Sequence, residues 1–237
     1  MMFKNYTGTD IPRRGSAFSA FSAPLRGRLF LFALAVCFSG VLNGAAAEKG
    51  SGASLNLLIC HQDQDRSKLH DADARDLPEA YVAKLAESNI VMVRYLLPNL
   101  IRKISWPEEG CEVVVIGTRV EVPAAHRSPR SPVKQQVDSG EMVLGAKIAA
   151  KAGLKKGDSA RLRGHVFLVR DVYAGRGTMD DNTVWLALSD AQELLDVKAR
   201  ITLIQVLECN CAWADVETVK AEMKALLPDT QVVVFGE

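Results

Sequence analysis

Short apolar runs alternate with polar stretches along this chain from residue 55 onward. Leu55–Ile59 predicts a brief strand, and the polar, acidic stretch that continues to Arg75 predicts a loop. Pro78–Ala86 predicts a helix, because proline suits a first turn and the apolar residues share one helical face. Val91–Leu97 and Glu112–Ile116 are rich in strand formers. This part of the chain is therefore expected to mix strands with a helix.

The pattern is densest after residue 140. Met142–Leu144 predicts a strand, and Ala146–Ala152 predicts a short helix that the following glycine ends. Ala160–Arg163 and Val166–Val169 flank the pair Gly164-His165, a spacing typical of a β-hairpin. Strand, helix and hairpin follow one another here within 30 residues, so this block is expected to be compact.

The C-terminal part continues the same alternation. Val184–Leu188 is apolar on both faces and predicts a central strand, and Ser189 is expected to cap a helix over Asp190–Leu195. The remaining elements are a strand at Ile201–Leu207, an amphipathic helix at Asp215–Leu227 and a strand at Gln231–Phe235. Together these elements predict a mixed-sheet α+β domain without internal repeats.

The N-terminus has the pattern of an export signal. Five basic residues precede residue 29 against one acid, and residues 1–28 are expected to stay in the cytoplasm. The uncharged run Leu29–Leu42 has the length of a signal-peptide core, with a small-residue cleavage site at Ala45–Ala47. Counted as Leu29–Ala47, the run is long enough to span a bilayer as a helix. Both interpretations stay open, and both place the domain at residues 54–237 outside the cytoplasm.

Composition excludes several classes of protein. The chain has 237 residues, of which 48% are hydrophobic and 24% charged, so a largely disordered chain is excluded. The net charge of +1 and the aromatic content of 6% argue against nucleic acid as a partner.

Two polar segments are candidate cation sites. Asp180-Asp181-Asn182 offers oxygen ligands, but a turn that caps the next strand is the favoured interpretation. His61 and His70, with Asp63 and Asp65, match no chelating spacing and are expected to be solvated loop residues. No metal ligand is assigned from either segment.

Four of the cysteines could form a disulfide, bind zinc or remain unpaired. Cys209 and Cys211 project to the same face if both lie on a strand, and Cys60 and Cys111 are the other candidates for pairing. A disulfide among these four is more plausible than zinc in an oxidising compartment, and unpaired buried thiols are equally plausible.

No motif for catalysis is present in the sequence. Gly175-Arg-Gly177 is followed by no Gly-Lys-Ser/Thr helix, so it is not a phosphate-binding loop. A Gly-x-Ser-x-Gly nucleophile elbow is also lacking. The sequence therefore predicts a non-enzymatic protein with no catalytic, cofactor-binding or metal-binding residues.

Several motifs occur in an order that is familiar from one family. They are Gly140–Gly145, Ala152–Asp158, Gly164–Val169, Asp180–Leu195 and Ile201–Val206. In this order they resemble the periplasmic core domain of MacB-like and FtsX-like ABC transporter permeases, including the lipoprotein-release permeases. The resemblance extends over Leu55–Val234.

The resemblance implies a MacB-like core domain behind one N-terminal apolar helix, in the bacterial inner membrane with its main domain in the periplasm. Such an ectodomain is similar to a lever or a docking surface. Its implied partners are a cytoplasmic ABC ATPase subunit, a second permease subunit and a periplasmic cargo or adaptor protein, with no nucleic acid. These permeases continue into further transmembrane helices, whereas this sequence stops at Glu237. A truncated permease or a stand-alone ectodomain is expected, and the alternative is a soluble exported binding or adaptor protein released by signal peptidase.

Overall fold

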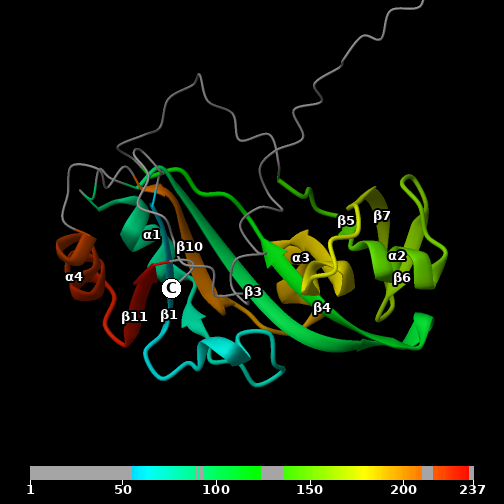
Figure 1. The fold of residues 1–237 in the computed structure, drawn as a ribbon, viewed down its shortest axis with the longest axis horizontal. Coiled ribbons are helices and arrows are strands. Elements are labelled where there is room, and N and C mark those ends of the chain that lie inside the picture. The colour runs from blue at the N-terminus through cyan, green and yellow to red at the C-terminus, as the bar shows by residue number, and fades with distance from the viewer. Residues whose placement is uncertain (1–54, 89, 91–92, 124–135, 210–215, 235–237) are drawn as a thin grey trace, which may run out of the picture. The chain divides into compact units, whose positions relative to one another are not determined.

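The computed structural model describes residues 55–234 except 89, 91–92, 124–135 and 210–215 (Figure 1). The segments expected at 1–28 and 29–47 lie outside these residues, so the expected domain boundaries stay predictions. Nowhere in the described part does a helix combine the length and apolar character needed to cross a membrane.

The elements follow the chain in this order: β1 Leu55–His61, η1 Arg66–Lys68, β2 Leu77–Pro78, α1 Ala80–Ala86, β3 Tyr95–Trp106, η2 Pro107–Glu109, β4 Cys111–Thr118, β5 Glu141–Leu144, α2 Ala146–Ala152, β6 Ser159–Leu162, β7 His165–Val172, η4 Met179–Asn182, β8 Thr183–Ala187, α3 Leu188–Leu194, β9 Arg200–Ile201, β10 Leu203–Cys209, α4 Val216–Leu226 and β11 Thr230–Val234.

One mixed sheet organises these elements. Among the described residues it contains nine strands in the order β11-β1-β10-β3-β4-β8-β5-β7-β6, and β2 and β9 form a separate small pair. The β4–β8 and β5–β7 pairs are parallel, and the other pairs in the large sheet are antiparallel. The α+β class and the mixed sheet predicted from the sequence are confirmed.

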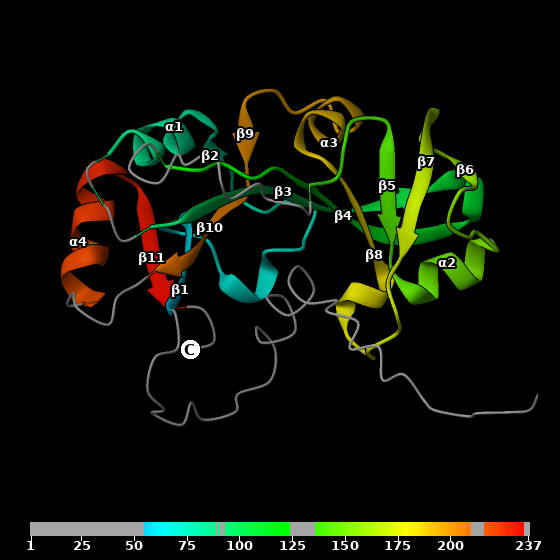
Figure 2. The ribbon, with the colours of Figure 1, turned by 90° about the horizontal axis from the view of Figure 1, so that it is seen from above.

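The first half of the sheet, β11-β1-β10-β3, is a split β-α-β arrangement. β1 and β3 each pair antiparallel with β10, so they run parallel to one another and α1 connects them. The second half of the sheet is inserted in the chain between β3 and β10. Figure 2 shows α1, β9 and α3 along the same side of the sheet.

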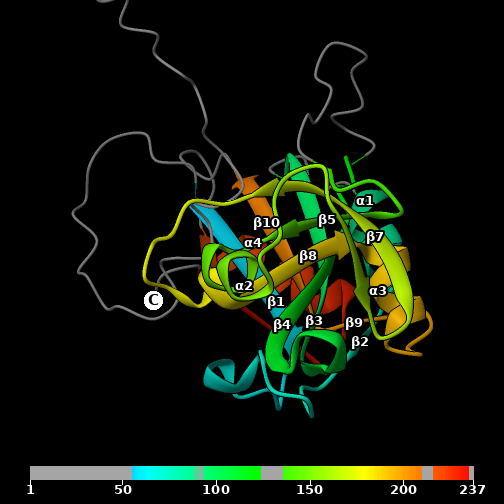
Figure 3. The same ribbon diagram turned by 90° about the vertical axis from the view of Figure 1, so that its right-hand side faces the viewer.

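Two apolar clusters pack against the sheet. The larger contains all the buried apolar side chains of the four α-helices, and the smaller contains strand residues with Leu69 and Val137 from connecting segments. In β4 the residues Val113 and Val115 join the larger cluster, while Val114 and Ile116 join the smaller. The alternation follows from the two-residue period of a strand. Figure 3 shows α2 and α3 to either side of β8.

A glycine in β4 sets how closely α3 packs on the sheet. A Cβ atom added at Gly117 would lie 2.2 Å from the Cβ of Ala191 in α3. Real Cβ atoms do not approach so closely, so the contact requires glycine on the strand and a small residue on the helix. The pair brings α3 directly onto β4 and β8.

The hairpin and the short helix after residue 140 form where the sequence predicts them. Ala146–Ala152 is helical throughout, and Gly153 ends the helix in a left-handed conformation with φ 66°. β6 and β7 are joined by two residues, Arg163 and Gly164, both with positive φ. The expected turn at Gly164-His165 is therefore shifted by one residue.

Several element boundaries predicted from the sequence are wrong. The strand expected at Ile201–Leu207 divides into β9, which pairs with β2, and β10, which belongs to the large sheet. The helix expected from Pro78 begins at Ala80, because Leu77 and Pro78 pair with β9 as β2. Ser189 does not cap α3, which begins at Leu188 with Ala187 before it and no side-chain cap. Leu188 is 2% exposed, so its side chain packs into the core from the first turn of the helix.

The strand expected at Val91–Leu97 instead begins at Tyr95 and continues to Trp106. A proline normally argues against a central strand, because it has no N–H to donate. Pro98 pairs with Ile204 of β10, while β4 begins to pair only from Asn99 onward. The N–H of Leu96 donates to the backbone oxygen of Glu121, on the side of β3 away from β10. Pro98 follows two residues later, so its ring nitrogen faces the same side. The missing N–H thus falls beyond the end of β4.

Leu186 is a core position of the second half at which we expect a substitution to be costly. Its side chain is 0% exposed, and in the sheet it lies between Gly117 of β4 and Met142 of β5. Leu186→Ala should lower the free energy of unfolding by about 2–5 kcal/mol, through lost burial and a residual cavity. Val166→Ala, at a position 59% exposed, should change it by less than about 0.5 kcal/mol. Urea unfolding of both variants measures the difference, and equal losses would contradict the assigned burial.

Candidate functional site

The junction between the two halves of the sheet lies on a single long strand. β3 pairs with β10 through Tyr95–Asn99 and with β4 through Asn99–Trp106, so Asn99 belongs to both pairings. Its side chain is 3% exposed and donates to the backbone oxygen of Leu97 at 2.8 Å and to Oε1 of Gln205 at 3.4 Å. The buried Asn99 amide therefore stabilises β3 at the residue where its pairing with β10 ends and its pairing with β4 begins.

An ion pair joins the same strand to the segment before α1: Arg102 of β3 pairs with Asp76. Arg102 donates through Nη2 to both carboxylate oxygens of Asp76 at 2.6 Å, and through Nη1 to Oγ1 of Thr202 at 2.9 Å. The side chains of Arg102 and Asp76 are only 11% and 19% exposed. A charge pair withdrawn from water must be well bonded, because losing one partner would strand the other charge.

A second charged pair lies just after β2. Arg119, which follows β4, bonds to Oε1 of Glu79, and Nε2 of Gln192 in α3 donates to Oε2 of the same carboxylate at 2.8 Å. Gln192 also donates to the backbone oxygen of Arg200 at 3.1 Å. Glu79 therefore ties the start of α1 to the end of β4 and to α3. We call Asp76, Glu79, Arg102, Arg119 and Gln192 the clamp.

The clamp keeps Glu79 ionised. Burial by itself raises the pKa of a carboxyl group, but the hydrogen bonds from Gln192 and Arg119, together with the Arg119 charge, outweigh it. The pKa of Glu79 consequently lies below its usual value. The clamp could not be predicted from the sequence, since its bonded residues are 26, 40 and 113 positions apart along the chain. The one signal in the sequence was Arg102, which directly follows the apolar pair Leu100-Ile101.

The far end of the β3–β4 hairpin binds the last two strands of the sheet. Nε1 of Trp106 donates to the backbone oxygen of Arg161 in β6 at 2.7 Å, and the Trp106 side chain is 0% exposed. The Glu108 carboxylate accepts the backbone N–H groups of Arg163 at 3.2 Å and Gly164 at 2.9 Å. One hairpin is thus bonded to β10 at its first end and to the β6–β7 turn at its other end.

The Asp180–Asn182 segment forms a capped turn. Oδ1 and Oδ2 of Asp181 accept the backbone N–H groups of Arg176 at 2.9 Å and Gly177 at 2.8 Å. The Arg176 bond is the largest of the effects that lower the pKa of Asp181. The pKa of Asp180 shifts the other way, because burial of its carboxyl group raises it. Both Asp181 oxygens have a backbone partner, which fits the turn interpretation.

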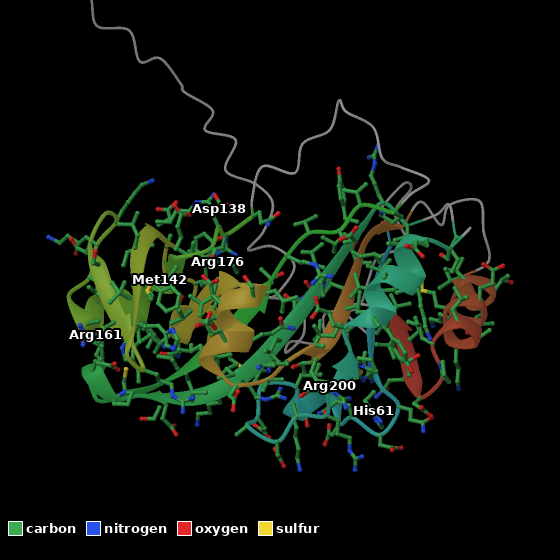
Figure 4. The ribbon with its side chains drawn as sticks, turned by 180° about the vertical axis from the view of Figure 1, so that it is seen from behind. His61, Asp138, Met142, Arg161, Arg176 and Arg200 are labelled. Atoms are coloured by element: carbon green, nitrogen blue, oxygen red, sulfur yellow. The ribbon has the colours of Figure 1, made fainter. Side chains whose placement is uncertain are left out.

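The predicted histidine segment brings Asp63, but not Asp65, near His61. The Asp63 carboxylate lies 3.8 Å from Nδ1 of His61 and 3.8 Å from Arg75, whereas Asp65 accepts from the N–H and hydroxyl of Ser67 as the cap of η1. Figure 4 shows His61 at a distance from Arg176, so the two candidate cation segments lie in different parts of the sheet. In the described ranges, no three His, Cys, Asp or Glu side chains are grouped to hold a metal ion. The absence of a metal site remains a prediction.

The structure does not pair Cys60 or Cys111. Cys60 is buried and burial raises its pKa to about 11, whereas Cys111 is half-buried. Cys60 faces Leu203 of β10 while Cys209 faces Leu55, so Cys60 and Cys209 lie at opposite ends of the β1–β10 pair. Of the two interpretations that the sequence left open, unpaired thiols hold for Cys60 and Cys111. The Cys209 side chain and Cys211 lie outside the described residues.

We expect the hydrogen bonds of the Glu79 carboxylate to make the stability of the fold depend on pH. A carboxyl whose pKa is lowered by folding stabilises the fold above its unfolded value of about 4.3, and this contribution disappears as the pH falls through the folded pKa. Glu79→Gln should therefore lower Tm at pH 7, and its difference from the wild type should shrink toward pH 3. Glu222→Gln, exposed on α4, is the control and should have no effect at either pH. A Glu79→Gln difference that stays constant with pH would contradict the assignment.

Comparisons with known proteins agree with the fold. No protein-family profile matches the chain, and no curated protein sequence matches it significantly. The periplasmic region of MacB from Actinobacillus actinomycetemcomitans is similar in structure, with a TM-score of 0.52 and 13% identity over 76% of this chain and 88% of that one. The extracellular domain of the noncanonic ABC-type transporter YknZ from Gram-positive bacteria gives a TM-score of 0.49 and 13% identity, over 75% of this chain and 99% of that one. The resemblance read from the sequence is thus confirmed at the level of the fold, and the described chain has the fold of the periplasmic region of MacB.

Proposed function

We propose that this chain is the extracytoplasmic domain of an ABC-transporter permease, and that it transmits movement driven by a cytoplasmic ATPase or docks a periplasmic partner. The observation that carries the proposal is the MacB-like fold, which extends over 76% of the chain. The basic and then apolar N-terminus favours export of residues 54–237. The proposed location is the outer face of the bacterial inner membrane.

The internal bonding supports transmission rather than chemistry. A domain that passes on a displacement has to move as a unit, which requires that its parts are bonded to one another at several separated points. The β3–β4 hairpin is bonded at its first end to β10 and at its tip to β6 and the β6–β7 turn. The clamp adds two ion pairs beside the junction. We assign no catalytic role to any residue of the chain.

Export is the first property to test. Alkaline phosphatase fused after Glu237 should be active in a bacterial host, and β-galactosidase fused at the same position should be inactive. The matched control lacks residues 1–47, and its alkaline phosphatase fusion should lose activity because the export segment is gone. An inactive phosphatase fusion with an active β-galactosidase fusion would overturn the proposed topology.

Attachment to a transporter is the second property. We expect the chain to fractionate with the inner membrane of its own organism and, after mild detergent extraction, to co-purify with a P-loop ATPase and a further permease subunit. Removal of residues 1–47 should abolish both results. Recovery of the chain in the osmotic-shock fluid, with Glu48 or a nearby residue as its N-terminus, would favour the alternative of a soluble exported binding or adaptor protein.

A further inference from the structure

A buried carboxyl group in the second half of the sheet lacks the hydrogen bonds that its neighbours have. Asp180 in η4 is 5% exposed, and in the described part of the chain its Oδ2 atom has no hydrogen-bond partner. The same holds for the buried Oγ1 atom of Thr178, two residues earlier. Folding removes water from such atoms, so each one that gains no partner lowers the stability of the fold. Because both residues belong to one turn, a bond between them would satisfy both atoms.

The adjacent carboxyl group is bonded differently. Both Asp181 oxygens accept backbone N–H groups, from Arg176 and Gly177, and these bonds stabilise its charged form. At Asp180, burial raises the pKa, and the Thr178 hydroxyl, which lies nearby but outside hydrogen-bonding geometry, does not offset the effect of burial. Of the two carboxyl groups, Asp180 is therefore the one that takes up a proton first as the pH falls.

Other charged and titratable groups surround this carboxyl group. Arg176, in the loop before η4, favours the charged form of Asp180, whereas the charge of Asp181 opposes it. Tyr173, which follows β7, is itself affected by the charge of Asp180. On the side of α2, Lys147 acts on Asp181. Burial remains the largest of the effects on Asp180, so its neutral form is favoured relative to that of an exposed aspartate.

The backbone that carries Asp180 is held on one side by the corner between β5 and α2. A Cβ atom added at Gly145 would lie 2.0 Å from the backbone oxygen of Asp180 and 2.7 Å from the carbonyl carbon of Asp181. The N–H of Gly145 donates to the oxygen of Thr183 at 2.8 Å, and the N–H of Asp181 donates to the oxygen of Thr178 at 3.2 Å. Contacts so close leave the turn little room to shift. A change of protonation, without movement of the backbone, is therefore the way for Oδ2 to gain a bond.

We propose that Asp180 and Thr178 form an acid-responsive switch. When the carboxylate takes up a proton from solvent, an O–H bond forms at Oδ2, and this group donates to Oγ1 of Thr178, so both atoms gain a partner. The turn over residues 178–183 is then tightened against Gly145 and the start of α2, whereas in the ionised form the two atoms stay unbonded. The proposal does not depend on the proposed transport function.

Asparagine at position 180 imitates the neutral carboxyl group, because its amide has the same shape and can donate to Thr178. A carboxyl whose pKa is raised by folding destabilises the fold above its unfolded value of about 3.9, and the loss grows as the pH rises toward the folded pKa. Asp180→Asn in the purified full chain in detergent should therefore raise Tm at pH 7 by about 2–5 °C, and the gain should shrink toward pH 4. Asp73→Asn, in an exposed loop, is the control and should change Tm by less than about 1 °C at either pH.

Substitution of Thr178 separates the proposed hydrogen bond from a general effect of charge. In a Thr178→Val background, which lacks the acceptor, Asp180→Asn should give less than about half of its gain in Tm, whereas a Thr178→Ser background should keep the gain. The proposal is overturned if Asp180→Asn lowers Tm at pH 7, if its gain does not change with pH, or if the Thr178→Val background keeps the full gain. It is also overturned if Ca²⁺ or Mg²⁺ raises the Tm of the wild type and Asp180→Asn abolishes that rise, because a cation would then hold the carboxylate.

Discussion

The architecture depends on one strand that has to satisfy different neighbours along its length. The first half of β3 pairs with β10 and the second half with β4, and the change occurs at a buried asparagine. β10 and β4 lie on opposite sides of this strand of 12 residues. The proline before Asn99 is tolerated because β4 has not yet begun to pair there, and the arginine after it is tolerated because Asp76 neutralises it. The polar residues at the junction are thus the condition for joining two halves in one sheet.

Close contacts then fix how the second half lies against this strand. Gly117 admits Ala191 at a distance that no side chain would allow, and a Cβ at Gly145 would lie 2.0 Å from the backbone oxygen of Asp180. These two glycines bring α3 and η4 against the ends of β4 and β5. Close contacts with the glycine backbone leave little freedom to slide, so the second half is held by shape as well as by the clamp.

The sequence predicted those features that are coded by neighbouring residues. The helix Ala146–Ala152, its glycine end and the β6–β7 hairpin all follow from residues within a few positions of one another. The length of β3 could not be predicted in this way, since its second half exists only because β4 pairs with it. Ser189 had the right chemistry for a cap, but burial of Leu188 began the helix earlier. The clamp was missed for the same reason as β3, because tertiary pairing and not local pattern brings its members together.

The path of the chain makes the junction the route by which the two halves are coupled. β1 and β11, the first and last described strands, are neighbours, with Leu57 opposite Val234. Any displacement applied through the flanking segments therefore acts first on the β11-β1-β10-β3 half. The inserted half is joined to it by the continuous backbone at β3 and β9, by the β3–β4 ladder and by the bonds of Glu79 to Arg119 and Gln192. Covalent connections alone would let the inserted half swing about two points. The ladder and the Glu79 bonds add attachments away from those points, so the inserted half is held to the first half by more than its two covalent connections.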